Sequence, residues 1–88
     1  MKVKIYSIFD RKAGVFNQPF FAMNDVQAQR SVYMREKVEP SQLSEFPDDF
    51  MLVYIGEFDH HSGDISGLDH KFDAICELRS LLRVERSE

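Results

Sequence analysis

The side chains whose types and spacing could bind a metal lie together in one short acidic segment: Asp59, His60, His61 and Asp64. Carboxylate and imidazole groups suit divalent ions, and a turn can bring such groups together. Neighbouring histidines, however, point apart on an extended backbone, and only His70 offers a further imidazole. The segment is more typical of a solvated acidic turn, so the sequence predicts no metal site and no cofactor.

Other catalytic chemistry has little support in the sequence. Cys76, the single cysteine, has no candidate base at helical spacing and is expected to be a small buried apolar residue. An acid–base pair could come from Asp48, Asp49, Glu57 and Asp59, but the first two fit a turn and strand entry beside Pro47. There is no glycine-rich phosphate loop, Walker pattern or zinc spacing. The sequence therefore predicts that the protein is not an enzyme, and a metal-dependent nuclease is the weakest alternative.

The remaining candidate chemistry is a basic and aromatic N-terminal segment. If residues 2–9 form a strand, its alternate side chains share one side, and the following turn and strand extend that side. Cations beside aromatic rings suit single-stranded nucleic acid, because charge follows the phosphates while the rings stack on the bases. The candidate nucleic-acid-binding residues are Lys2, Lys4, Tyr6, Arg11, Lys12, Phe16 and Phe20. The alternative, which composition alone favours slightly, is that the rings belong to the core and the lysines solvate an edge strand.

Charge is segregated along the chain. Residues 1–37 carry seven basic and three acidic side chains, whereas residues 38–70 carry eight acidic side chains and no lysine or arginine. The net charge of −4 therefore hides a basic part, which can attract a polyanion, and an acidic part, which can attract a protein. Opposite charges, an edge strand and the leftover apolar residues Leu81 and Val84 also favour a homodimer.

The predicted strands and helices, which position these side chains, indicate one α+β domain over residues 1–88. Alternating apolar residues predict strands at about 2–9, 15–22 and 50–58, and Pro19 places the second at an edge of a small antiparallel sheet. Asn24 can cap a helix over about 24–38, which packs on one face of the sheet. The spacing of apolar residues from Phe72 to Leu82 predicts a C-terminal helix.

The predicted helix over 24–38 has an apolar stripe led by Val26, Tyr33 and Met34 and supplemented by Ala28 and Val32. The solvent-exposed face of this helix is expected to include Gln29, Arg30, Arg35 and Glu36. Hydrophobic residues make up 43% of the 88-residue chain, which is enough for a core. No run of about 18 apolar residues and no signal-like segment occurs, so an intracellular protein is expected.

Several short motifs in order resemble the small nonstructural protein of gokushoviruses, which are tailless bacteriophages with circular single-stranded DNA genomes. The motifs are Ile5–Asp10, Lys12-Ala13, Pro19–Phe21, Ala28 with Arg30, Phe46–Phe50, Leu52, Ile55–Asp59 and Gly63. The resemblance spans about residues 2–65, whereas residues 66–88 depart from it as a variable tail.

This resemblance implies a phage protein made in the host bacterial cytoplasm and absent from the mature virion. It further implies an accessory protein that binds DNA, with single strands favoured, during genome replication or packaging. The resemblance supplies no catalytic residues. The alternative function is a non-catalytic interaction module that docks phage or host replication or assembly proteins through its acidic surface.

Overall fold

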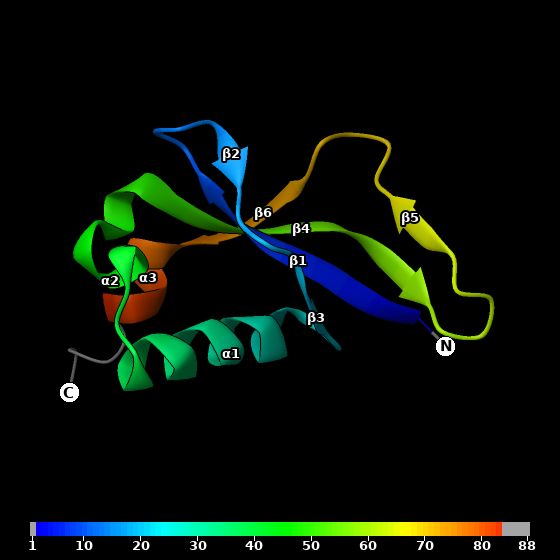
Figure 1. Ribbon diagram of the computed structural model, residues 1–88, viewed down its shortest axis with the longest axis horizontal. Coiled ribbons are helices and arrows are strands. Elements are labelled where there is room, and N and C mark those ends of the chain that lie inside the picture. The colour runs from blue at the N-terminus through cyan, green and yellow to red at the C-terminus, as the bar shows by residue number, and fades with distance from the viewer. Residues whose placement is uncertain (1, 84–88) are drawn as a thin grey trace.

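The described residues, 2–83 of a computed structural model, form one antiparallel sheet of six strands with helices beside it, which confirms the α+β class. The elements in chain order are β1 (Lys2–Asp10), β2 (Val15–Phe16), β3 (Phe20–Ala22), α1 (Asp25–Val38), α2 (Gln42–Glu45), the 3-10 turn η1 (Pro47–Asp49), β4 (Phe50–Asp59), β5 (Ile65–Gly67), β6 (Asp73–Glu77) and α3 (Leu78–Arg83). Figure 1 shows α1 running beside the sheet, with α2 and α3 at one end and the β4–β5 hairpin at the other. Within residues 2–83, no helix is long and apolar enough to cross a membrane.

The centre of the sheet is the antiparallel pair of β1 and β4. They pair along their whole length, from Lys2 opposite Asp59 to Asp10 opposite Phe50. β2 and then β3 pair with the other side of β1, while β5 and β6 pair with the other side of β4. The strand predicted over 15–22 is thus at an edge, as expected, but residues 17–19 divide it in two. Pro19 lies in this break, where the backbone donor that it lacks is not needed.

The two connecting turns follow from their residue types. In the β1–β2 turn, Asp10 Oδ1 accepts hydrogen bonds from the backbone N–H groups of Lys12 and Ala13, at 3.0 and 3.1 Å. Gly14 and Gly63, one in each turn, have φ angles of 72° and 81°. Only glycine adopts this left-handed conformation without strain, so the predicted turns are confirmed.

The helix α1 begins and ends as predicted, but its buried face matches the predicted apolar stripe only in part. Asn24 Oδ1 accepts a hydrogen bond from the Gln27 backbone at 2.8 Å, which is the expected N-cap. The buried positions are Ala28, Val32 and Glu36, whereas Val26 is 66% exposed. The expected stripe is confirmed at Ala28 and Val32, and Tyr33 packs against the core, but it was wrong at Val26 and Met34, which are exposed. Apolar residues occur all round this helix, so periodicity could not fully select the buried face.

Glu36, which was expected to be wet, is only 5% exposed. Its carboxylate accepts hydrogen bonds from the backbone N–H and hydroxyl of Ser41 and from the hydroxyl of Ser44, at 2.9, 2.7 and 2.8 Å. Three donors compensate for the loss of hydration that burial of a carboxylate causes. Glu36 therefore connects the end of α1 to the start of α2 by hydrogen bonds.

The C-terminal part differs most from the sequence prediction. Residues 73–77 form the edge strand β6, and only Leu78–Arg83 is helical, so the helix predicted from Phe72 was wrong over its first half. A bulge in β6 between the partners of Leu52 and Val53 allows Ile75 and Cys76 to pack against the same core. Two adjacent inward residues imitate helical spacing, which explains the error.

The tail was expected to leave apolar residues for a partner subunit. Leu81 instead packs in the core and is buried, and so is Leu78 at the start of α3. Val84 lies outside the described residues. Leu81 therefore gives no support to a homodimer.

Candidate nucleic-acid interface

The predicted site residues lie on two different faces of the sheet. Lys2, Lys4 and Tyr6 share one side of β1, as expected, and this side faces α1 and α3. Phe16 pairs with Phe9, whose side chain lies on the opposite side. The seven residues therefore do not form one surface.

Tyr6 is fully buried, so the expectation that its ring stands exposed beside the lysines was wrong. Its hydroxyl donates a hydrogen bond to Asp25 Oδ1 at 2.6 Å, which joins the centre of β1 to the first turn of α1. Burial, and then the contact with Asp25, raises the pKa of Tyr6. Phe20 is half-buried on the same side, with its ring centroid 6.0 Å from that of Tyr6. Both rings belong to the core, the alternative that the sequence left open.

The predicted cations have different surroundings. Lys2 Nζ is 3.6 Å from Glu57 Oε1, and Lys4 Nζ lies 5.3 Å from the centroid of the Tyr54 ring. Arg11 is ion-paired with Glu77 and also donates to the Asp48 carbonyl, so it is held in place. Lys12 is exposed and forms no ion pair within residues 2–83. Lys2 begins β1 and Lys12 lies in the turn beyond its other end, so the length of the strand, about 27 Å at the rise of an extended chain, separates them.

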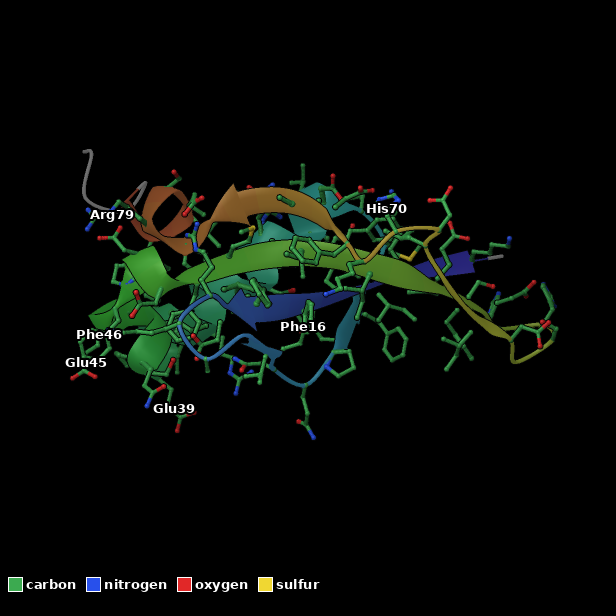
Figure 2. All side chains as sticks on the ribbon, turned by 90° about the horizontal axis from the view of Figure 1, so that it is seen from above. Phe16, Glu39, Glu45, Phe46, His70 and Arg79 are labelled. Atoms are coloured by element: carbon green, nitrogen blue, oxygen red, sulfur yellow. The ribbon has the colours of Figure 1, made fainter. Side chains whose placement is uncertain are left out.

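Phe16 belongs to a set of rings on the side of the sheet away from α1, here called the open aromatic face: Phe9, Phe16, Phe21, Phe58 and Phe72. Figure 2 shows the molecule from this side, and Phe16 lies near the middle of the molecule's long dimension. The centroids of Phe9 and Phe16 are 4.8 Å apart, and those of Phe9 and Phe72 are 5.4 Å apart. Phe16 is 43% and Phe21 57% exposed, so the rings meet solvent.

Sequence reasoning identified only one of these five rings. The turn at Asp10–Gly14 already implied that Phe9 and Phe16 face each other, since a short turn fixes the register of the flanking strands. Phe58 reaches this face because the β1–β4 register shifts between Ile5 and Tyr6, and no sequence pattern signalled that shift. Phe72 was missed because it was assigned to a helix.

Two lysines lie near rings of the open aromatic face along the chain. Lys12 lies in the β1–β2 turn, and Lys71 immediately precedes Phe72. Within residues 2–83, neither side chain has an ionic or hydrogen-bonded partner. Both ammonium groups therefore remain able to bind an anion.

One family of known proteins matches most of the chain. A family model described as Phage ORF5 protein matches residues 3–81. The chain belongs to the phage ORF5 protein family. The match extends beyond residue 65, where the motifs of the gokushovirus resemblance end, and includes β6 and part of α3. No curated protein and no solved structure gives a significant match.

The acidic segment considered as a metal site is the β4–β5 turn of this phage protein. Asp59 Oδ1 accepts a hydrogen bond from the His61 backbone at 2.9 Å, which lowers the pKa of Asp59. Across residues 2–83, no three His, Cys, Asp or Glu side chains are grouped so that they could hold a metal ion. Cys76 is half-buried, and burial, followed by the charge of Glu77, raises the pKa of its thiol. A raised pKa disfavours the nucleophilic thiolate.

His70 lies between two carboxylates in the loop before β6, next to Lys71 and Phe72. Its Nδ1 is 2.7 Å from Asp69 Oδ1, and its Nε2 is 2.6 Å from Asp73 Oδ1. Both nitrogens can donate only in the imidazolium form. The hydrogen bonds to Asp73 and then to Asp69 raise the pKa of His70, and the bond from His70 lowers the pKa of Asp69.

We expect Asp73→Asn to move the pKa of His70 toward the ordinary value of about 6.5. Because the pKa is raised in the folded state, stabilisation by the charged ring is complete below about pH 6.5 and is lost as the pH rises through the folded-state pKa. Imidazole proton shifts measured against pH test this, with Asp64→Asn in the β4–β5 turn as the control. An unchanged His70 titration in Asp73→Asn would show that this contact does not form in solution.

Proposed function

We propose that the chain is a non-catalytic accessory protein of a small bacteriophage of the gokushovirus type, and that it binds single-stranded DNA through the open aromatic face. The DNA would be bound in the host bacterial cytoplasm, during genome replication or packaging. The family match supports a phage protein. The observation that carries the DNA proposal is the set of five phenylalanine rings on one face of the sheet, with Phe16 and Phe21 exposed.

The chemistry of this face suits a single strand better than a duplex. Splayed bases can stack on exposed rings, whereas the bases of a duplex already stack on one another. The ammonium groups of Lys12 and Lys71 can neutralise phosphates beside the rings. The acidic residues of 38–70 would repel the backbone elsewhere and limit the length of strand bound.

The predicted site residues contribute unequally in this proposal. Phe16 and Lys12 touch the strand directly. Lys2 and Arg11 contribute less, because each is paired with a carboxylate of this chain that offsets its charge, and Lys4 lies over the Tyr54 ring. Tyr6 and Phe20 support the sheet from its other side.

Fluorescence anisotropy of a labelled oligothymidylate at two salt concentrations tests the proposal. Phe16→Ala should weaken binding by about 1–3 kcal/mol at either salt concentration, as expected for one lost stacking contact. Lys12→Gln should reduce the logarithmic salt slope by about 0.7, as expected for one lost phosphate contact. Phe46→Ala and Arg30→Gln are matched controls, since Phe46 is 55% exposed between α2 and η1 and Arg30 is exposed on α1.

Three results would contradict the proposal. The first is wild-type protein that fails to bind DNA even at low salt, and the second is Phe16→Ala that binds no more weakly than Phe46→Ala. Light scattering could also show a dimer that Phe16→Ala converts to monomer, with no DNA binding by either form. That result would assign the open aromatic face to the contact between two copies and would favour the protein-interaction alternative.

A further inference from the structure

A cleft of about 710 Å³ lies on the other side of the sheet, between α1, the β2–β3 connection and α2. Its volume is in the range of natural small-molecule sites. The floor is apolar and is formed by Ile8, Phe20, Val32, Leu43 and Phe50. A flat ring system can therefore be buried there by apolar and aromatic contacts.

The rim of the cleft carries polar groups without partners. The guanidinium of Arg35 and the side-chain amides of Asn17, Gln18 and Gln42 line it. Within residues 2–83, none of these four side chains has a hydrogen-bond partner. Side-chain amides can both donate to and accept from a base edge, and a guanidinium binds phosphate with several parallel donors.

Two carboxylates also line the cleft, and their existing hydrogen bonds determine which oxygens remain able to accept from a ligand. Glu36 is buried, and its oxygens already accept the three hydrogen bonds from Ser41 and Ser44. Asp10 Oδ1 accepts two backbone N–H groups of the β1–β2 turn, which leaves Oδ2 as an acceptor. Asp10 lies on β1 and Arg35 on α1, so the negative and positive groups come from different walls.

We propose that this cleft binds one nucleotide. The base rests on the apolar floor between Phe20 and Phe50, and its edge meets Asn17, Gln18 and the free oxygen of Asp10. The phosphate meets Arg35 on the opposite wall. The nucleotide comes either from solution or from a DNA strand, and only the second source rests on the proposed function.

Titration of 15N-labelled protein with 5′-dGMP tests the cleft by NMR. Amide shifts are expected at Asn17, Gln18 and Phe20 and in residues 31–36. Arg35→Gln should weaken dGMP binding about tenfold, as loss of a charge-assisted contact implies. Arg30→Gln, an exposed and unpartnered position on the same helix, should bind as wild type does. Deoxyguanosine, which lacks the phosphate, should bind more weakly than dGMP and should not distinguish Arg35→Gln from wild type.

The outcomes separate the cleft from the open aromatic face. The cleft proposal is overturned if millimolar dGMP shifts no amide signal of the cleft, or if wild type and Arg35→Gln bind dGMP equally. Either result holds even if the oligonucleotide binds the phenylalanine rings. Cleft shifts with dGMP but no oligonucleotide binding anywhere would support a site for a free nucleotide and refute the proposed function. Cleft shifts with both ligands, lost in Arg35→Gln, would show that a nucleotide of the strand enters the cleft.

Discussion

Replacing Tyr6 with Ala is expected to lower the free energy of unfolding by about 3–5 kcal/mol, as for a large aromatic residue removed from a core. Tyr6 is fully buried, and its ring contacts those of Phe20 and Tyr54, with centroids 6.0 and 5.6 Å away. Its removal leaves a cavity under α1 and deprives the Asp25 carboxylate of a donor. Urea denaturation followed by far-ultraviolet circular dichroism measures the change.

Tyr6→Phe separates the two contributions. The ring remains, and only the hydrogen bond to Asp25 is lost, so a smaller loss of about 1.5–3 kcal/mol is expected. If Tyr6→Ala were as stable as wild type but failed to bind DNA, the core role would be refuted and a stacking role supported.

Leu78→Ala is expected to cost about 2–5 kcal/mol of unfolding free energy. Leu78 is the first residue of α3, is fully buried, and packs in the cluster that contains Tyr6 and Leu52. The loss should appear as a lower urea midpoint without a change in the denaturant slope.

Leu68→Ala is the matched control for that variant, because Leu68 is only half-buried in the β5–β6 loop. It should destabilise the protein less than Leu78→Ala. Equal stability of Leu78→Ala and wild type would mean that the C-terminal helix does not pack on the sheet in solution.

The parts of the fold that the sequence predicted correctly are those with strong local signals. β1 and β4 show clear apolar patterns, Asn24 caps α1, and Asp10 and Gly14 shape a turn. Each signal acts within a few residues, so no knowledge of distant contacts was needed. The edge position of Val15–Ala22 also followed locally, from one proline.

The parts that were missed depend on distant contacts. Tyr6 is buried because α1 packs on the side of β1 to which the Tyr6 ring points. The alternating pattern of β1 does not show which side of the strand the helix covers. The strand β6 forms by pairing with the outer edge of β4, which is distant in sequence, and its bulge gives two adjacent inward residues that resemble helical spacing. The open aromatic face combines β1, β2, β3, β4 and the loop before β6, so no single segment contained its signal.

The pairing of β1 with β4 has a consequence for synthesis of the protein. The first strand of the sheet finds its central neighbour only when residues 50–59 have been made, and β6 closes the other edge later still. Until then, the nascent chain carries Ile5, Tyr6 and Ile8 without the strand that completes their packing. Nascent chains that have not yet exposed residues 50–59 therefore present unpaired apolar residues of β1 and are open to aggregation with one another.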